Sequence, residues 1–272
     1  MTKEELVKLQ TTQYNILKDV VALCEQYEIT YYLAYGTLLG AVRHQGTIPW
    51  DYDIDIFMTR SNLEKFLTIS HELSEAYEIS SVGSGKNNAM GLMRVYKKGS
   101  LIYTDEHGRE GAHAIHIDIF VLDCAKEYPK ITRKIVNAIV KYLSIAKLSG
   151  YEKQWLYELW QDSFLKKAVC KSGDLLKLFI KESTIEIWIH KLLVQHNLNL
   201  SDNKKLVVVL YPRQIYLENY FGEGVDIKYE DRFFKAPKKS DELLKMWYGD
   251  YNQLPPEEER FTSNMERWIV EF

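Results

Sequence analysis

Apolar and polar residues follow two different spacings along the first part of the chain, which predicts a mixture of helices and strands. Across residues 3–27, apolar residues recur mostly at steps of three and four, which indicates an amphipathic helix. Residues 29–35 are an apolar, aromatic run that predicts a strand, and the run breaks at Gly36 and Thr37. Residues 38–43 can form one or two helical turns. We therefore expect a strand–turn–helix junction whose backbone N–H groups suit a phosphate.

A second predicted strand has two chemically different faces. Residues 53–58 alternate aspartate with isoleucine, and side chains at i and i+2 of a strand share a face. Asp53 and Asp55 should therefore lie side by side, opposite an apolar face. Residues 113–121 repeat the alternation around Asp118, which predicts a neighbouring strand whose carboxylate faces the pair.

The intervening residues predict a helix and more strands. Ser61 with Glu64 three residues later fits a capping box for this helix. In the strand that carries Asp118, His113 and His116 are three residues apart, which puts them on opposite faces and argues against a shared metal. The expected elements are a helix over residues 61–76, a strand over 77–82, and a hairpin of strands 92–96 and 100–103.

The second half of the chain has a different pattern. Residues 131–198 read as several helices with few strand signals, and residues 211–224 are rich in Tyr and Phe. We predict an α+β (mixed α/β) fold whose catalytic core sheet, within residues 1–124, is flanked by helices. A basic helical segment, residues 125–200, follows the core. The aromatic C-terminal part, residues 201–272, is expected to pack back on the core.

Composition narrows the class of protein. The chain has 272 residues, 46% hydrophobic and 27% charged, which is ordinary for a globular protein. No apolar run approaches the roughly 20 residues of a membrane span, and the N-terminus does not resemble a signal peptide. Cys24, Cys124 and Cys170 are scattered, which argues against a disulfide framework or a zinc site. We therefore expect a cytoplasmic protein.

Charge is unevenly distributed. Residues 126–200 hold 13 Lys and Arg against 7 Asp and Glu, a net charge of +6, whereas the rest holds 22 against 31, a net charge of −9. The basic segment suits an anionic partner, such as the inner membrane face or a polyanionic acceptor. Solvated helix faces rich in lysine explain the excess equally well. The acidic remainder weighs against nucleic acid.

The paired aspartates suggest a metal site. Like charges side by side repel each other, and a divalent cation that also binds substrate phosphates relieves the repulsion. Two exposed acids on an edge strand would be the ordinary explanation of an isolated D-x-D. Here the pair follows a Gly-Thr turn and Arg43-His44 and precedes Asp118, and this combination favours catalytic Mg²⁺, with Mn²⁺ as the alternative.

The stretch A-Y-G-T-L-L-G-A-V-R-H-Q-G-T-I-P-W-D-Y-D-I-D-I resembles the signature of the LicD family of bacterial phosphocholine transferases. Its glycine and hydroxyl residue, its D-x-D and the later H-I-D-I-F also resemble the nucleotidyltransferase fold. Y-G-D-Y…P-P-E-E-E-R, residues 248–260, resembles a later block of the family, and the middle third of the chain matches little. The family usually has W-D-D-D-I-D, so Tyr52 replaces one acid. Alternation turns Tyr52 away from Asp53 and Asp55, so the metal site should survive.

The resemblance implies an enzyme that transfers phosphocholine from CDP-choline to a sugar hydroxyl of teichoic acid or lipopolysaccharide type, and releases CMP. The acceptor would be polymeric or lipid-linked. Asp53, Asp55 and Asp118 would hold the metal, and Asp118 would also orient or deprotonate the acceptor hydroxyl.

Further residues are candidates for binding substrate. Arg43 suits a forked phosphate contact and His44 is a second choice, while Arg94 either holds a phosphate or forms a surface ion pair. A quaternary ammonium needs aromatic faces, although packing also explains each aromatic residue. The substrate-binding candidates are Gly36, Thr37, Arg43, His44, Trp50, Arg94, Trp247, Tyr248 and Tyr251.

Three rival functions remain open at this point. The same scaffold would also serve transfer of ribitol or glycerol phosphate from another CDP-alcohol. An ordinary nucleotidyltransferase would transfer the nucleotide itself. A non-catalytic scaffold would bind a nucleotide or precursor without turnover, and loss of one of the three aspartates would have favoured it.

Overall fold

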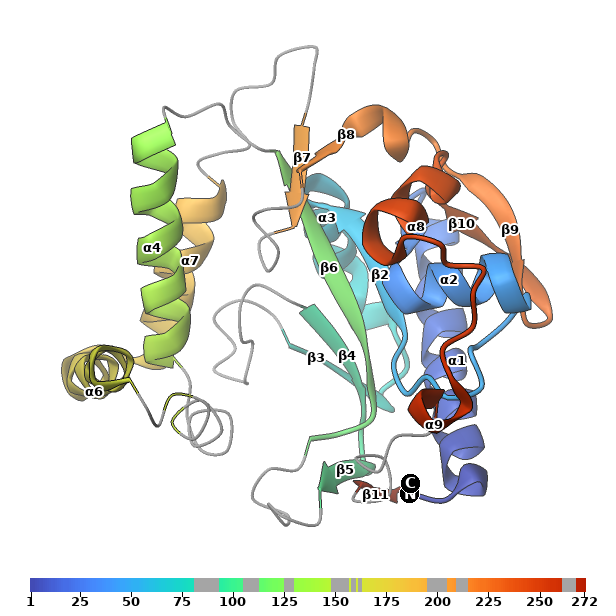
Figure 1. Cartoon of the computed structure of the whole chain (residues 1–272), viewed down its shortest axis with the longest axis horizontal. Helices are drawn as coiled ribbons and strands as arrows, with labels where there is room; N and C mark the ends of the chain where they lie inside the picture. Colours follow the sequence, from blue (N-terminus) through green and yellow to red (C-terminus); the bar gives the residue numbers. More distant parts are fainter. Residues whose placement is uncertain are drawn as a thin grey trace.

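The computed structural model of the chain describes residues 1–80, 93–104, 113–124, 130–147, 157, 160, 163–194, 205–208, 215–260 and 268–272. A mixed sheet flanked by helices lies at its centre, which confirms the predicted fold class (Figure 1).

The sheet has the strand order β1-β2-β6-β4-β3; in addition, β7 pairs with the last three residues of β6, and β8 pairs with β7. β2 and β6 run parallel, and the other neighbouring pairs are antiparallel. Its strands are β1 (Tyr32–Leu33), β2 (Asp55–Thr59), β3 (Tyr77–Ser80), β4 (Met93–Lys97), β6 (His116–Cys124), β7 (Lys205–Val208) and β8 (Ile215–Leu217).

Helix α1 (Lys3–Gln26) covers one face of the sheet and confirms the predicted N-terminal helix. A capping box between Thr2 and Glu5 fixes its start, because each side chain accepts a hydrogen bond from the backbone N–H of the other. Its apolar side packs with the isoleucines of β2 and β6, and the resulting core excludes water from that face.

The junction before β2 is tighter than the sequence suggests. β1 covers only two residues, and helix α2 (Tyr35–His44) begins two residues after it. The Leu38 N–H donates to the Ala34 carbonyl at 3.0 Å, which closes the first helical turn around Gly36 and Thr37. The predicted turn at these two residues is therefore wrong: they belong to the helix.

Helix α3 (Arg60–Ile69) also begins earlier than predicted. Thr59, the last residue of β2, is its N-cap and accepts a hydrogen bond from the Asn62 N–H at 3.4 Å. Ser61 consequently lies inside the first turn and is not the cap. A 3-10 turn, η1 (Ser70–Glu72), ends the helical stretch before residue 76.

The predicted hairpin of strands 92–96 and 100–103 does not form. β4 has β3 on one edge and β6 on the other, so no edge remains for β5 (Leu101–Thr104). β5 pairs instead with the C-terminal strand β11 (Trp268–Glu271). A separate antiparallel hairpin is made by β9 (Val225–Tyr229) and β10 (Arg232–Ala236).

The basic segment contains the helices α4 (Lys130–Lys147), α6 (Phe164–Phe179) and α7 (Glu182–Val194). They gather at the end of the molecule opposite α1 and α2 (Figure 1). Leu143, Ile185 and Ile189 form a small core of their own. The last part of the chain adds β7 and β8 to the sheet, η4 (Glu218–Tyr220), α8 (Ser240–Tyr248) and α9 (Glu257–Arg260). The three-part division remains a prediction.

A helix that spans a bilayer must be both long and apolar, and none of the helices in the described part of the chain combines the two.

A buried ion pair attaches α3 to the sheet. Arg60 donates from Nε and Nη2 to the two Asp123 carboxylate oxygens at 2.9 and 2.8 Å, and the side chains are only 9% and 3% exposed. Replacing Arg60 with Leu leaves the Asp123 charge buried without its forked donor. We expect Arg60→Leu to lower the free energy of unfolding by about 3 kcal/mol, measured by urea denaturation.

The matched control is Arg232→Leu. Arg232 donates to Glu25 at 3.0 Å, but these side chains are 33% and 52% exposed. Its loss should cost about 1 kcal/mol or less, because water solvates the remaining carboxylate. Equal losses in the two variants would contradict a special contribution from the buried pair.

Candidate active site

Two aspartates lie side by side on the face of the sheet opposite α1. Asp55 opens β2 and is the register partner of Asp118 on the parallel strand β6. Phe57 and Phe120 are partners one step further along, on the same face, because side chains of a strand alternate. The intervening isoleucines point to the α1 core. The predicted pairing of Asp118 with the D-x-D strand is therefore correct.

Asp53 reaches this group from a loop. It precedes β2 by two residues, so the predicted strand over residues 53–58 begins too early. The charges of the three aspartates nevertheless interact. The charge of Asp118 helps to raise the pKa of Asp53, and the charge of Asp53 helps to raise the pKa of Asp55. The loop and the strands thus bring Asp53, Asp55 and Asp118 together.

Burial dominates the electrostatics of this group. Asp55 is 7% exposed, and burial raises the pKa of its carboxyl well above the ordinary value. The charges of Asp53 and Asp118 raise it further, whereas the nearby Arg94 opposes the shift. Burial also raises the pKa of Asp53, and the hydrogen bond with Asp51 counters part of that change. The charge of Arg94 therefore offsets only part of the rise in the pKa of Asp55.

Asp51 is a fourth acid that the sequence interpretation missed. Burial raises its pKa well above the ordinary value, and the charge and hydrogen bond of Asp53 add to the shift. The two-residue spacing of Asp51, Asp53 and Asp55 was a signal that could have found it. A side chain at Gly36 would put its Cβ 2.6 Å from Asp51 Oδ2, so this position must stay small for Asp51 to approach.

Thr37 fixes the start of β2. Its hydroxyl oxygen accepts a hydrogen bond from the Asp55 N–H at 2.9 Å, and the residue is 3% exposed. The helix that follows β1 is thereby attached to the first residue of the acidic strand. A phosphate contact from Gly36 or Thr37 remains a prediction.

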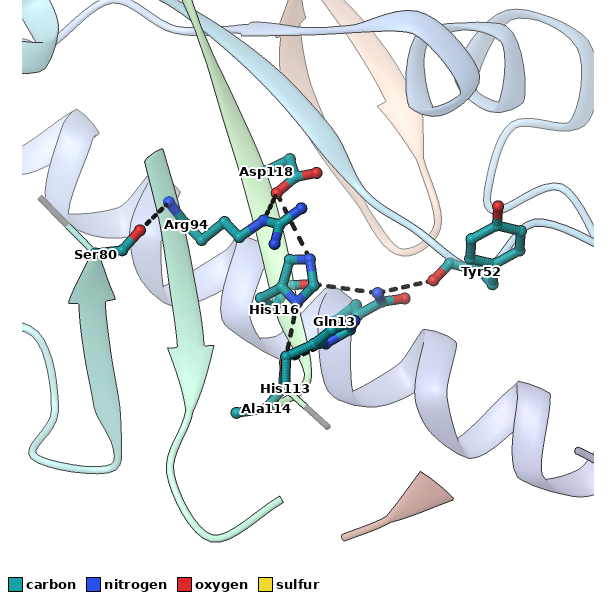
Figure 2. Close-up of polar contacts among 8 residues, drawn as sticks. All are labelled: Gln13, Tyr52, Ser80, Arg94, His113, Ala114, His116 and Asp118. Carbon is teal, nitrogen blue, oxygen red and sulfur yellow. Dashed lines mark hydrogen bonds and ion pairs between the residues drawn. The ribbon is translucent and has the colours of Figure 1, made fainter. Parts of the chain in front are cut away.

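Arg94 and His116 surround Asp118, as Figure 2 shows. Arg94 Nε donates to Asp118 Oδ1 at 2.7 Å, and His116 Nε2 lies 3.6 Å from the same oxygen. Burial and then the charge of Arg94 lower the pKa of His116 to about 3, so its imidazole is neutral near pH 7. Of the two expectations for Arg94, the ion pair forms, and it forms inside the site.

His113 does not lie in β6, contrary to the predicted strand over residues 113–121. Its ring meets the ring of His116 edge to face, with centroids 4.9 Å apart. The predicted placement on opposite faces is therefore wrong, since that argument requires both residues to belong to one strand. Burial and then the charge of His116 lower the pKa of His113 to about 4.

Two glutamines of α1 bind the loop that carries Asp51 and Asp53. Gln13 is 4% exposed, and its Nε2 donates to the carbonyls of Tyr52 at 2.9 Å and His116 at 3.1 Å (Figure 2). Gln10 Nε2 donates to the carbonyls of Ile48 and Asp51 at 3.1 and 2.7 Å. Gln13 thus ties the loop before Asp53 to the strand before Asp118. A polar residue between Leu9 and Leu17, at four-residue steps in the apolar stripe, was the sequence signal for it.

Arg43, His44 and Trp50 form a second group near the end of α2. Arg43 Nη1 donates to the Tyr251 carbonyl at 2.7 Å, and the ring of His44 meets Trp50 edge to face at 5.8 Å. Burial and then the charge of Arg43 lower the pKa of His44. The Arg260 guanidinium lies over Trp50 at 5.3 Å. Their binding of substrate remains a prediction.

The aromatic candidates do not form one cage. Trp247 lies in an aromatic cluster on the acidic face, with its ring 4.8 Å from Tyr35 and 6.0 Å from Phe57. Tyr248 is 44% exposed beside it. Tyr251 is buried away from this cluster and donates its hydroxyl to Asp241 at 2.8 Å. The remaining candidate, Trp50, belongs to the second group.

The aspartates match a hard cation in chemistry. They offer oxygen ligands, and their crowding is costly without positive charge. Among the described residues, however, no three His, Cys, Asp or Glu side chains converge as the ligands of one ion. Asp118 is turned toward Arg94 in this arrangement. The metal site remains a prediction. The oxygen ligands of the three aspartates are of the kind that such an ion prefers.

Carboxylates on adjacent parallel strands of a mixed sheet, reached by a third from a loop, are the arrangement expected of a nucleotidyltransferase-type enzyme. Residues 28–170 match the family described as LicD/FKTN/FKRP, nucleotidyltransferase domain. The chain belongs to this LicD family, which confirms both the family resemblance and the prediction of a phosphotransferase enzyme.

Several relatives are similar over different lengths. Lipopolysaccharide cholinephosphotransferase LicD of Haemophilus influenzae is 31% identical over 265 residues, covering 96% of each chain. An uncharacterized protein of Rickettsia prowazekii is 36% identical over 104 residues, or 34% of this chain and 36% of the relative. Human ribitol 5-phosphate transferase FKRP is 51% identical over 37 residues, or 14% of this chain and 8% of its own.

Replacing Gln13 should loosen the site. Gln13→Met keeps the approximate size of the side chain but removes both hydrogen bonds to the Tyr52 and His116 carbonyls. We expect a loss of about 1–3 kcal/mol in the free energy of unfolding, because two inward-facing acceptors lose their donor. Gln26→Met, an exposed substitution on the same helix, should change it by less than about 0.5 kcal/mol. Equal changes in the free energy of unfolding for the two variants would show that the hydrogen bonds of the Gln13 amide do not stabilise the fold.

Neutralising Asp55 should stabilise the metal-free protein. The folded carboxyl has a raised pKa, so the folded state binds more protons than the unfolded state above pH 3.8, the ordinary value. Its charge therefore destabilises the fold at neutral pH, and this effect diminishes as the pH falls through the raised pKa. Asp55→Asn should raise the melting temperature in EDTA at pH 7, with a smaller difference at pH 5, measured by circular dichroism. A lower melting temperature at pH 7 would contradict this electrostatic account.

Proposed function

We propose that this protein transfers phosphocholine from CDP-choline to a sugar hydroxyl of a cell-surface glycopolymer, of teichoic acid or lipopolysaccharide type, and releases CMP. The observation that carries the proposal is the placement of Asp55 beside Asp118 on adjacent parallel strands, with Asp53 near enough for its charge to raise the pKa of Asp55. The similarity to a cholinephosphotransferase along 96% of the chain supports the choice of transferred group.

These three aspartates would hold Mg²⁺, or Mn²⁺ in its place. The bound ion would neutralise negative charge on the diphosphate as CMP leaves. Asp55 is held for this task by Thr37, and Asp53 is held by the loop that Gln10 and Gln13 attach to α1.

Asp118 would orient the acceptor and take its proton. The hydroxyl oxygen would bond to the phosphorus of phosphocholine while the bond from phosphorus to the CMP oxygen breaks, and the hydroxyl proton would pass to a carboxylate. Arg94, 2.7 Å from Asp118, would meet a phosphate oxygen on the same side. Gly36, Thr37, Arg43 and His44 are further candidates for phosphate contacts.

The aromatic cluster on the acidic face suits the choline end. Tyr35 has ring centroids within 5.0 Å of Phe57, Phe120 and Trp247, next along the strands from Asp55 and Asp118. Aromatic faces attract a quaternary ammonium, which has no hydrogen-bond donor to offer. Trp247 is the best supported of the predicted aromatic contacts, whereas Trp50, Tyr248 and Tyr251 are proposed only as neighbouring contacts.

A second candidate is transfer of another CDP-linked phospho-alcohol, such as ribitol or glycerol phosphate. The 37-residue similarity to a ribitol 5-phosphate transferase favours it. A non-catalytic scaffold is disfavoured, since all three aspartates are present and Asp55 is the register partner of Asp118.

The acceptor in this proposal is polymeric or linked to a lipid, and nucleic acid is not a partner. Transfer would take place in the cytoplasm, with peripheral contact at the inner membrane face. Residues 1–124 would form the catalytic core, residues 125–200 the basic helical segment, and residues 201–272 the part that packs back on the core.

The test is calorimetric titration with CDP-choline, CDP-ribitol and CDP-glycerol, each with Mg²⁺ and with EDTA, followed by assay of CMP release. We expect metal-dependent binding of CDP-choline. Asp53→Asn should weaken it at least about tenfold and reduce CMP release at least about hundredfold, because charge stabilisation at the phosphorus is lost.

Asp226→Asn provides the control, since Asp226 is an exposed acid paired with Lys235 on the β9–β10 hairpin. It should bind and react like the natural protein. Binding of CDP-ribitol or CDP-glycerol alone would replace choline by the second candidate. Binding of none of the three would sink the transferase proposal.

A further inference from the structure

Helix α6 presents large apolar side chains to solvent. Phe164, Leu165, Leu175, Leu178 and Phe179 are between 58% and 86% exposed. Singly exposed apolar residues are ordinary. Five on one helix of 16 residues are more than such scatter explains, and exposed apolar surface of this kind marks a site of interaction with a protein or a membrane.

The exposed side chains follow the helical period. Phe164, Lys171, Leu175 and Leu178 fall close to one line along the helix, because their spacings correspond to whole numbers of turns within about a quarter turn. Phe179 lies one turn after Leu175. The opposite side of α6 packs on α4, where Gly173 lies against Ala146 and a Cβ at Gly173 would come within 2.7 Å of the Ala146 backbone. The helix therefore contacts α4 through Gly173, and its large apolar residues face outward.

Positive charge accompanies the apolar face. α6 holds four lysines against one acid, Asp174; by the helical period Lys167 and Lys171 fall on the apolar face, whereas Lys166 and Lys177 fall toward the opposite side. Residues 126–200 as a whole carry a net charge of +6, whereas the rest of the chain carries −9. Lysines beside an apolar helical face are the composition of helices that lie in a membrane interface.

We propose that the outward face of α6 docks on the surface of a bilayer that contains anionic lipid. Such a surface offers acyl chains for the phenylalanines and leucines and phosphates for the lysines. A second copy that met α6 through the same face would present its own lysines and repel it. A nucleic acid would satisfy the lysines but leave the five apolar side chains without a matching phase.

The position of α6 suits this contact. α4, α6 and α7 gather at one end of the molecule, and α6 lies at its outer corner in Figure 1. Docking there would hold the core sheet near the membrane without using a residue of the candidate active site. The inference rests on the membrane contact in the proposed function, assigns that contact to α6, and is tested without donor or acceptor.

The experiment is flotation of the full chain with vesicles of phosphatidylcholine alone and of phosphatidylcholine mixed with phosphatidylglycerol. We expect binding to the mixed vesicles, reduced by salt. Leu175→Gln combined with Phe179→Gln should weaken it at least about tenfold, since two apolar side chains lose their insertion. Lys167→Gln combined with Lys171→Gln should weaken binding to the mixed vesicles by a similar factor.

Two matched variants control for surface changes elsewhere. Leu217→Gln with Phe233→Gln removes one leucine and one phenylalanine that are 45% and 63% exposed outside the basic segment. Lys65→Gln with Lys98→Gln removes two exposed lysines within residues 1–124, outside the basic segment. Both should float like the natural protein, and circular dichroism confirms that every variant is folded.

Three results would overturn the proposal. The first is failure of the natural protein to float with the mixed vesicles. The second is flotation of the α6 variants with these vesicles to the same extent as the natural protein. The third is a dimer in light scattering that the Leu175/Phe179 variant dissociates while vesicle binding stays unchanged, which would assign the face to a second copy.

Discussion

The parallel pairing of β2 with β6 is the constraint on which the rest of the site depends. It sets Asp55 beside Asp118 and, one step further, Phe57 beside Phe120. A slip of one residue in either strand would turn its carboxylate into the α1 core and an isoleucine into the site. The isoleucines buried against α1 oppose that slip, so the hydrophobic core of one face fixes the chemistry of the other.

Crowded carboxylates are unfavourable, and the surrounding structure holds them in place. Burial and mutual repulsion raise the pKa of Asp55, which means that the charged form is disfavoured in the folded state. Gln10 and Gln13 bind the loop carbonyls, Thr37 binds the first amide of β2, and Gly36 leaves room for Asp51. This combination of local repulsion and firm support is typical of sites that are arranged for charge in a reaction.

The chain separates two electrostatic tasks. Asp55 and Asp118 lie on the central sheet and Asp53 in the loop before it, while the lysines and outward apolar residues of α6 lie in the helical group at the other end. An acidic site that faced an anionic surface directly would be repelled by it. In the proposed docking, the basic helices would lie between the acidic site and such a surface, which would give the charge asymmetry of the sequence a structural meaning.

The sequence by itself determined the period-dependent features: α1, the alternation that puts Asp55 and Asp118 on one side of their strands, the mixed fold class and the family. These features are local, because a helical or strand period is written in successive residues. Only the tertiary structure decided that β5 pairs with β11, that His113 meets His116, and that Trp247 and Trp50 belong to different groups. It also drew Asp51 and Gln13 into the site. Each of these contacts joins residues whose proximity depends on how the chain folds back or bends, and the local pattern of hydrophobicity carries no information on such distances.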